Sequence, residues 1–550
     1  MMIHVSRSPR LCWTIALLAI LLPAARSQAL TPDLEVIAVS GQSALGVIAG
    51  YEARGVGGRL LGADGQVAFG VGLVDSSDNV RWSLWRSDRQ HAEVVAVTGE
   101  PAPGTDDGSV YSYLPAHRFV PDGTLYFTSD LLPSSDGRTF GLFAHAAGGT
   151  ASLQARSTGV YSLDWSINQL GRSAVRANDG SIYYYDHLST TPSLVFEAGY
   201  TEPAFGLASL SLFGGQLVLN DQGVLLSEGS IGYTYGTADY YDSGFWTVDR
   251  AGKVTEIARE GSPAPGYGPG HVFGPLGLNK WQRGAADMNS SGEVAFIGDV
   301  YSTAPPAFGG VDVWVTGPDG QLRSIASWGD SLPGAEGITL GYPYPPTISD
   351  SGVVVFAADL ETGDRDRDSG IFKGASREDL AVVAVEGQQA PGLPPCAVLG
   401  DFGEWGWSGQ WATFEANASG RVAFHCFVVN DSGFDLGPEP SGIWAENLQG
   451  DLQLIAHTGE SLDVNPDPAI TDERVIERLS PFGNDLFATS SQKYFNDRGQ
   501  ILFTATFTDG TSGVFVSNLV AVPEPAGLAL ALAAAGLLWR PRRRSSGRQT

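Results

Sequence analysis

Cysteine, methionine and histidine are scarce in this sequence, whose 550 residues include 3 Cys, 3 Met and 8 His. So few cysteines exclude a cysteine-based zinc site. Cys12 lies near the N-terminus, which leaves Cys396 and Cys426 in the body of the chain. These two form either one disulfide in an oxidising compartment or two unrelated buried thiols, and the sequence leaves both alternatives open.

Charge is also scarce, and most of it is of one sign. Charged residues make up 17% of the chain, against about a quarter in an ordinary soluble domain, and the net charge is −27. Arginines gather at the two ends, so the segment between them is more acidic than the whole chain. Such a surface repels phosphate backbones, which excludes nucleic acid as a partner, and it suits a solvated protein outside the cell.

Sequence motifs of catalysis are missing. The chain has no His-Glu-x-x-His and no Gly-x-Ser-x-Gly, and its histidines are scattered without the spacing of metal ligands. The sequence therefore favours a non-catalytic protein and leaves the question of an enzyme open.

Glycine and aromatic residues are abundant, with 71 Gly and 10% Phe, Trp and Tyr, which is typical of short strands joined by Gly-rich turns. One pattern recurs along the body: an Asn-x-x-Gly, Ser-x-x-Gly or Asp-Gly turn followed by an alternating strand. Clear copies begin at residues 64, 122, 220, 289, 349, 417 and 496, and a weaker copy spans 168–171.

Two further elements follow within most units. One is Gly with an apolar and an aromatic residue, as at 244–246 and 442–444; the other is a strand that ends in Gly, as at 255–261 and 454–459. At about sixty residues the unit is longer than a propeller blade of about forty to fifty, and we attribute the excess to insertions such as 231–243 and 394–411. One such sheet cannot bury both of its faces alone, so the units must stack.

The two ends of the body predict a closed ring. The last unit lacks its Gly-ending strand, and the segment Leu34 to Gly41 has the pattern of that missing strand. A ring in which the first strand completes the last sheet explains both facts and leaves no exposed sheet edge. We therefore predict an all-β fold, a β-propeller of about eight blades with a degenerate blade near 153–193. Seven blades is the alternative count, and an open β-solenoid is the alternative architecture.

The N-terminus has the pattern of a secretory signal peptide. Arg7 and Arg10 precede the apolar run 11–22, Pro23 breaks the run, and small residues around 27–29 offer a cleavage site. The run is too short to span a bilayer comfortably. We expect the Sec translocon to export the chain and residues 1–29 to be removed.

The C-terminus combines a short motif, an apolar run and a basic end. Pro523, Glu524 and Pro525 precede the apolar run 527–539, which arginines 540–544 follow. With the residues before it the run could just cross a membrane, and the arginines would hold the end in the cytoplasm with the body outside. Proline keeps the motif extended and out of the helix, so it stays accessible at the membrane face.

This tail resembles the PEP-CTERM sorting signal, and the resemblance covers only the last thirty or so residues. It implies recognition of Pro523, Glu524 and Pro525 by an exosortase-type membrane transpeptidase that removes the helix and the basic end. The body resembles uncharacterised bacterial propeller-like repeat proteins, which implies no catalytic residue. We therefore predict a signal peptide at 1–29, a repeat domain at 30–519 and a sorting signal at 520–550. The inner membrane would anchor the protein transiently before it reaches the cell surface or the medium.

Two local patterns could bind ligands. Asp364, Asp366 and Asp368 alternate in one short segment, as a hard cation such as Ca²⁺ requires, but the glycine comes one place late for an EF-hand loop. A solvated hairpin tip is the alternative, and no other cofactor is expected. Separately, Trp405, Trp407 and Trp411 lie in a Gly-rich insertion, where they would stack on sugar rings or pack at a blade edge.

Two functions fit these observations. The first is an exported, non-catalytic repeat protein that binds polysaccharide or protein of the extracellular matrix or envelope. The second is an extracellular glycan-active enzyme, a lyase or hydrolase, with its site in the channel of the propeller. Carboxylate, histidine and arginine converging at one channel mouth would favour the enzyme. A channel lined by Gly, Val and Asn would favour binding alone.

Overall fold

The computed structural model describes residues 33–518 with internal gaps, and these residues belong to one compact unit, Asp33–Val520. The residues outside the description are 1–32, 42–47, 49–50, 89–90, 133–138, 159–164, 178, 187–191, 202–208, 213–216, 236–237, 277–285, 304–305, 333–337, 364–367, 396, 403–412, 431–439, 466–468, 481–493 and 519–550.

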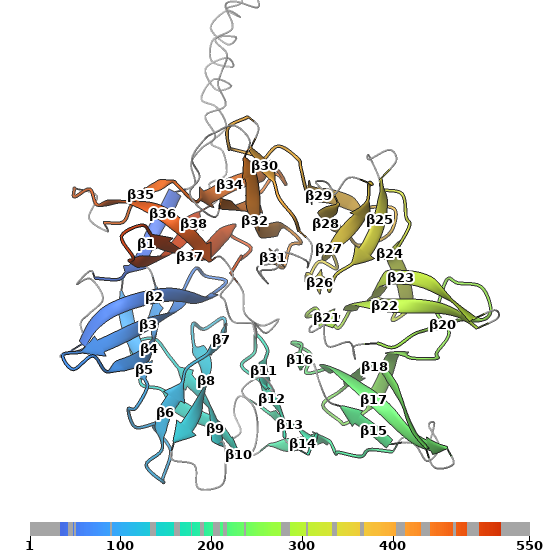
Figure 1. Ribbon diagram of the computed structural model, residues 1–550. Coiled ribbons are helices and arrows are strands. Elements are labelled where there is room, and N and C mark those ends of the chain that lie inside the picture. Colours follow the sequence, from blue (N-terminus) through green and yellow to red (C-terminus); the bar gives the residue numbers. More distant parts are fainter. Residues whose placement is uncertain are drawn as a thin grey trace, which may run out of the picture. The chain divides into compact units, whose positions relative to one another are not determined.

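Every named element of the described chain is a strand, and the strands form eight antiparallel sheets arranged around a centre (Figure 1). We call these sheets blades 1 to 8. Blade 1 consists of β2 (Tyr51–Leu61), β3 (Val67–Asp75), β4 (Val80–Ser87) and β5 (Ala92–Val97). Blade 2 consists of β6 (Val110–Tyr113), β7 (Ala116–Phe119), β8 (Leu125–Leu132), β9 (Thr139–His145) and β10 (Ser152–Thr158). Blade 3 consists of β11 (Trp165–Ile167), β12 (Ser173–Arg176), β13 (Ile182–Tyr185) and β14 (Ser193–Phe196). Blade 4 consists of β15 (Ser209–Leu212), β16 (Val218–Leu219), β17 (Leu225–Tyr235), β18 (Ala238–Val248) and β19 (Val254–Arg259).

The second half of the chain repeats this arrangement. Blade 5 consists of β20 (His271–Phe273), β21 (Ala286–Met288), β22 (Val294–Thr303), β23 (Pro306–Thr316) and β24 (Leu322–Ser327). Blade 6 consists of β25 (Thr339–Pro343), β26 (Thr347–Ile348), β27 (Val354–Glu361), β28 (Ser369–Gly374) and β29 (Ala381–Val385). Blade 7 consists of β30 (Ala397–Leu399), β31 (Thr413–Ala416), β32 (Val422–Asn430), β33 (Ser441–Glu446) and β34 (Leu452–His457). Blade 8 consists of β35 (Ser461–Asp463), β36 (Glu473–Ser480), β37 (Gln500–Phe507), β38 (Ser512–Asn518) and, from the other end of the chain, β1 (Asp33–Val39).

In five blades the first strand is divided in two, and both halves pair with the same next strand. In blade 5, for example, β20 and β21 pair with opposite ends of β22. The inner halves β7, β16, β21, β26 and β31, together with β11 of blade 3, lie around the centre of the ring (Figure 1), and each contacts the next along the chain. These inner strands and the turns that follow them surround the centre of the ring, which we call the central channel because residues of these strands, such as Arg118, Ser166 and Asp287, line a cavity there.

The repeated glycine before the aromatic residue has a packing reason. Side chains two places apart on a strand share a face, so a ring at the second position can fold back over a glycine at the first. A Cβ on Gly442 would lie 2.5 Å from the ring of Trp444, and one on Gly141 would lie 2.6 Å from the ring of Phe143. Trp444 and Phe143 are completely buried, so in these blades the glycine makes room for the core ring.

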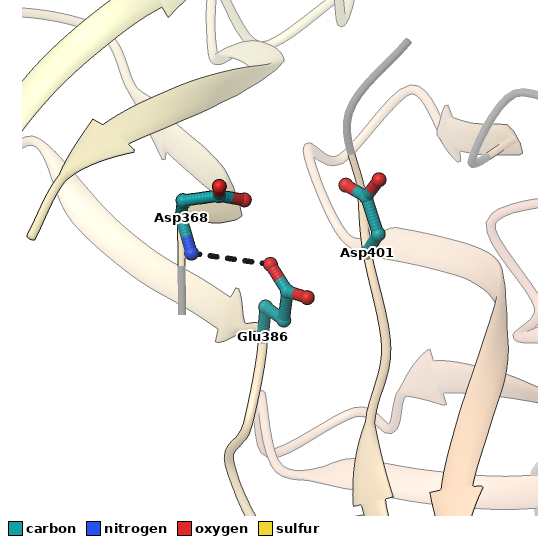
Figure 2. Close-up of side chains that lie close together, drawn as sticks. All are labelled: Asp368, Glu386 and Asp401. Atoms are coloured by element: carbon teal, nitrogen blue, oxygen red, sulfur yellow. Dashed lines mark hydrogen bonds between the residues drawn. The ribbon is translucent and has the colours of Figure 1, made fainter. Parts of the chain in front are cut away.

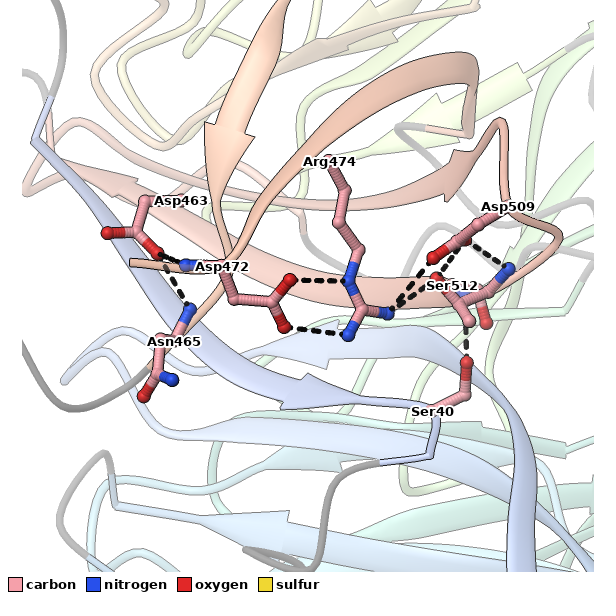
Figure 3. A network of polar contacts seen from close by, with 8 residues as sticks. Ser40, Asp463, Asn465, Asp472, Arg474, Asp509 and Ser512 are labelled. Carbon is pink, nitrogen blue, oxygen red and sulfur yellow. Dashed lines mark hydrogen bonds and ion pairs between the residues drawn. The ribbon is translucent and has the colours of Figure 1, made fainter. Parts of the chain in front are cut away.

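The ring is closed by pairing the two ends of the chain, as the sequence predicts. β1 pairs antiparallel with β38 from Asp33↔Asn518 to Val39↔Gly513. Beyond the strand, Ser40 Oγ accepts a 2.8 Å bond from Ser512 N, and Arg474 of β36 lies between Asp472, at 2.8 Å, and Asp509, at 3.6 Å (Figure 3). A core of β1, blade 8 and blade 1 side chains packs across the closure.

The predicted propeller of eight blades is confirmed, with two local differences. The degenerate blade is blade 3, which begins at Trp165, because residues 152–158 belong to blade 2 as its outer strand β10. The segment 231–243, expected as an insertion, stays within the sheet: it lengthens the hairpin of β17 and β18, whose pairing runs on to Tyr235↔Ala238. Across the described ranges no helix is long and apolar enough to cross a membrane.

Candidate functional site in the central channel

The Asn-x-x-Gly turns at the channel are held by their own asparagines. Asn289 Oδ1 accepts bonds from the amides of Ser291, at 3.1 Å, and Glu293, at 2.9 Å. Asn496 Oδ1 does the same for Arg498 and Gln500, at 3.1 and 3.0 Å. The side-chain oxygen thus satisfies backbone donors of a tight turn, which is the local role that asparagine commonly has there.

In four of these turns the side-chain nitrogen of the asparagine donates to a carbonyl of the neighbouring blade. Asn168 Nδ2 donates to Asn220 O at 2.9 Å, Asn289 Nδ2 to Ser349 O at 3.1 Å, and Asn417 Nδ2 to Asn496 O at 3.2 Å. Asn496 Nδ2 carries the series across the closure to Gly62 O at 3.0 Å. The asparagines therefore stabilise their own turns and also join the turns of neighbouring blades. The sequence pattern alone did not predict these bonds between blades.

Aspartates add a second link at the same junctions. The Oδ1 atoms of Asp221, Asp350 and Asp497 accept amides of the preceding blade, at 2.8, 2.9 and 3.0 Å. A third link comes from the position two residues before the turn: Ser166, Asp287 and Glu415 accept an amide of the next blade through their side chains. The junctions from blade 3 to 4, 5 to 6 and 7 to 8 therefore share three kinds of hydrogen bond.

Blades 1 and 2 depart from this pattern. At the positions of the turn asparagine and aspartate they have residues without a polar side chain, such as Gly62, Val120 and Pro121. Two residues before the turn, blade 1 has Leu60, whereas blades 3, 5 and 7 have Ser166, Asp287 and Glu415. In blade 2 the position two residues before the turn is occupied by Arg118 of β7. No hydrogen bond or ion pair joins the Arg118 guanidinium to another side chain in the part of the chain that the structure describes.

A cavity of about 430 Å³ lies where these turns meet. Arg118 lines it, together with residues from blades 1, 3, 4, 5, 6, 7 and 8. Its acidic lining residues are Asp64, Asp221, Asp287, Asp350 and Asp497. Its volume falls within the range of small-molecule pockets, about 300–1,000 Å³.

The electrostatics of the cavity centre on Arg118. Burial lowers the pKa of its guanidinium, while the carboxylates of Asp221, Asp350 and Asp287 act in the opposite direction, so the group stays charged. Asp221 and Asp350 use only Oδ1 for the neighbouring turn, so within the described residues their Oδ2 atoms have no hydrogen-bond partner. The cavity thus presents one planar set of donors opposite free carboxylate acceptors, which suits a hydroxyl-rich ligand.

A second concentration of charge lies between blades 6 and 7. Ligand atoms of Asp368, Glu386 and Asp401 all lie within 4.8 Å of one another (Figure 2). Glu386 Oε2 accepts Asp368 N at 3.1 Å and Ser369 Oγ at 3.0 Å. Burial raises the pKa of Glu386 to about 7, and Asp401 and Asp368 add to the rise against the hydrogen bond from Ser369. These three carboxylates are the described residues that could hold a hard cation such as Ca²⁺.

The corresponding place in blade 4 shows what blade 6 lacks. There Ser243 bonds Glu260 as Ser369 bonds Glu386, but Asp242 is paired with Arg259 at 2.9 Å. Arg259 lies opposite Gly244 in the sheet, and the residue opposite the equivalent Gly370 is Val385. Position 385 of blade 6 therefore supplies no counterpart of the Arg259 guanidinium of blade 4.

The predicted site residues fall into two groups. Asp368 is described and lies beside Glu386 and Asp401, whereas Asp364 and Asp366 lie outside the described residues. Cys426 is buried, its Sγ lies 3.4 Å from Gly400 O and 3.1 Å from Phe427 O, and burial raises the pKa of the thiol. Its partner in the predicted disulfide, Cys396, is not described, so that pairing stays a prediction.

The remaining predicted residues are outside the description altogether. They are the sorting motif, Pro523, Glu524 and Pro525, and the stacking tryptophans, Trp405, Trp407 and Trp411. Sequence reasoning missed Arg118, Asp221, Asp287 and Asp350. The available signal was Arg118 itself, a cation two residues before a turn where three other repeats carry Ser166, Asp287 and Glu415.

Fold and site define a closed eight-bladed propeller with a polar cavity at its centre. The family model described as "Family of unknown function (DUF7453)" matches residues 25–178 and 167–529, and the chain belongs to that family. None of the curated proteins matches the chain.

Several solved structures are similar to the chain at low identity. They include an α-L-arabinanase of Penicillium chrysogenum in complex with arabinobiose, 10% identical, covering 73% of this chain and 94% of its own, with a TM-score of 0.24. The polysaccharide lyase Uly1 is 10% identical, covering 89% of this chain and 100% of its own, with a TM-score of 0.29. A sialidase of Trypanosoma rangeli is 9% identical, covering 84% of this chain and 59% of its own, with a TM-score of 0.25. At these scores the likeness carries no argument about function.

Proposed function

We propose that this protein is an exported, surface-sorted propeller that binds extracellular matrix or envelope polysaccharide by holding a sugar unit in the channel cavity. The observation that carries the proposal is Arg118, a charged guanidinium without an ion-pair partner among the described residues, inside a cavity lined by aspartates. A fixed cation among carboxylates that do not pair with it is costly to maintain unless something binds there.

The cavity chemistry supports a neutral, polyhydroxylated ligand. Five lining aspartates outnumber Arg118, so an anion would meet net repulsion. Sugar hydroxyls can donate to the free Oδ2 atoms of Asp221 and Asp350, while Arg118 donates to a hydroxyl or ring oxygen. No histidine is among the described lining residues, and most lining carboxylates already accept bonds from neighbouring turns, which supports binding rather than proton transfer.

Replacing Arg118 with glutamine should weaken sugar binding by about tenfold or more, because it removes the positive charge and the paired N–H donors of the guanidinium group. Glucose, galactose, cellobiose and maltose are titrated by calorimetry into wild type and Arg118→Gln. The matched control is Arg156→Gln. Arg156 lies on the outer strand β10 of the same blade, pairs with Asp107 at 2.5 Å and does not line the cavity. Equal affinity of Arg118→Gln and wild type, or no heat from any of the four sugars, would contradict the proposal.

The two ends of the sequence support export and sorting. The signal-peptide pattern and the tail that resembles a PEP-CTERM signal both imply a body outside the cell, handed to an exosortase-type transpeptidase. We expect a tagged protein in its native host to occur trimmed, in the envelope or medium, only when that enzyme is present. Glu524→Ala should stay untrimmed in the same strain. Untrimmed protein in the inner membrane of both strains would leave a membrane-anchored periplasmic propeller instead.

An enzyme is the second candidate, and one observation favours it. Arginine and several carboxylates do converge in one cavity, as a glycan lyase or hydrolase requires. New reducing ends or unsaturated products from a glycan incubated with wild type, absent with Arg118→Gln and present with Arg156→Gln, would establish catalysis in the channel.

A further inference from the structure

A row of aromatic side chains lies far from the channel, on the outer parts of blades 5 and 6. Its members, which we call the aromatic row, are Tyr301 of β22, Phe308 of β23, Trp328 after β24 and Tyr342 of β25. Successive ring centroids are 5.5, 5.9 and 6.4 Å apart, and each pair meets edge to face. Phe308 is 49% exposed and Trp328 is 42% exposed, so the row presents ring surface to solvent.

The row is built by a local irregularity of blade 5. The register of β22 with β23 shifts between Val300↔Gly310 and Tyr301↔Phe308. This bulge changes the direction of the side chains that follow it on the strand. Gly310 has a φ of 134°, which favours glycine. Because Tyr301 and Phe308 lie directly opposite each other after the shift, their rings fall on one face of the hairpin.

The fold itself does not require a tryptophan at position 328. The amide of Trp328 donates to Val311 O, and the same bond is made in other blades by Thr98, Glu260, Glu386 and Thr458. Those four residues are small or acidic, so blade 5 alone among these five places a large ring there. A substitution that costs solubility and serves no core is a candidate binding feature.

The polar neighbours of the row fix its geometry. Trp328 Nε1 donates to Glu361 Oε1 at 2.7 Å, and Thr339 Oγ1 donates to Glu361 Oε2 at 3.3 Å. At the end of the row Tyr344 packs on Tyr342 with centroids 6.1 Å apart, and its hydroxyl donates to Asp359 at 2.6 Å. Trp328 is thus held in place by the bond at its indole nitrogen, and ring surface of Trp328 and Phe308 stays exposed for a partner.

We propose that the aromatic row is a binding platform for a neutral polysaccharide chain. Single-file rings with polar residues beside them match a linear chain of sugars, whose C–H faces stack on aromatics and whose hydroxyls donate to carboxylates such as Glu361. The acidic surface disfavours anionic polymers. This site is independent of the channel cavity, because none of its residues lines that cavity.

Affinity electrophoresis tests the platform on the protein purified from its host. Native gels contain hydroxyethyl cellulose, laminarin, pullulan or galactomannan, and an alginate gel serves as the anionic comparison. We expect wild type to be retarded by at least one neutral polymer and not by alginate. Trp328→Ala and Phe308→Ala should each bind about tenfold more weakly, and Trp328→Phe should retain most of the binding.

The control variant is Trp82→Ala, which removes another exposed tryptophan, 55% exposed on β4 of blade 1. It should be retarded like wild type, and so should Arg118→Gln, which separates this site from the channel. The proposal is overturned if all four neutral gels leave wild type unretarded, or if Trp328→Ala migrates as wild type does. Self-association lost in Trp328→Ala, with no retardation of wild type, would assign the row to a protein contact instead.

Discussion

Replacing Val39 with aspartate is expected to lower the free energy of unfolding by about 3–5 kcal/mol, the range for an unpaired charge in a packed core. Val39 is 1% exposed, and it pairs with Gly513 at the end of β1. It belongs to the core shared by β1, blade 8 and blade 1, so the new carboxylate would lie where the ring closes. Loss of that strand would also leave β38 as an open edge.

The matched control for this prediction is Val80→Asp. Val80 is also a strand valine, at the start of β4 in blade 1, where it pairs with Val74, but it is 57% exposed. Its replacement should change the free energy of unfolding by less than about 0.5 kcal/mol. Urea unfolding followed by tryptophan fluorescence compares the two, and equal midpoints for both variants would show that β1 does not hold the ring closed.

The second large effect is a dependence of stability on pH that Glu386 controls. Its folded-state pKa is raised to about 7 from 4.5, because burial and then Asp401 and Asp368 disfavour the carboxylate. The folded state therefore binds the proton more tightly than the unfolded state. The contribution of Glu386 to the free energy of unfolding is highest below pH 4.5. It falls as pH rises from about 4.5 to 7 and is constant above that. Glu386→Gln should remove this slope and add about 2 kcal/mol of stability at pH 8, after allowance for solvent screening.

Blade 4 supplies the design of a second variant. Val385→Arg would place a guanidinium where Arg259 pairs with Asp242, and we expect it to flatten the same part of the pH profile. Ala381→Arg is the control, because it adds the same charge at an exposed position on the same strand β29. Melting temperatures between pH 4 and 9 measure all three variants. If the melting temperature of Glu386→Gln changed with pH in the same way as that of wild type, the raised pKa of Glu386 would not be the cause of the pH dependence.

The parts of the fold that the sequence predicted are those with local causes. An Asn-x-x-Gly turn is stabilised by hydrogen bonds to its own backbone, so four consecutive residues are enough to recognise it. The close contact of Gly442 with the ring of Trp444 likewise involves only three consecutive residues. The closure was predictable as well, because a strand pattern missing at one end was present at the other. The displaced start of blade 3 came from its short strands, since four-residue strands such as Ser173–Arg176 carry little alternating pattern.

The channel site depends on geometry that no local pattern contains. Arg118, Asp221, Asp287 and Asp350 come from blades 2, 4, 5 and 6, and they meet only because the ring closes with a particular number of blades. Aligning the repeats on their turns does single out Arg118, but not the carboxylates it faces. The aromatic row likewise depends on a bulge at Tyr301 and on the neighbouring position of two blades.

The three kinds of bond shared by alternate blade junctions group most of the ring into pairs of blades. Asn168, Asn289 and Asn417 recur in every second blade, and each reaches forward to a blade whose turn carries Asp221, Asp350 or Asp497. Donor and acceptor therefore form a two-blade module, and a copy of one blade alone would bring half of a matched set. Removing or adding a single blade would therefore separate a donor from its acceptor, whereas removing or adding such a pair would keep the remaining bonds intact. Arg118 lies in the pair formed by blades 1 and 2, whose turns have Gly62 and Val120 in place of these asparagines.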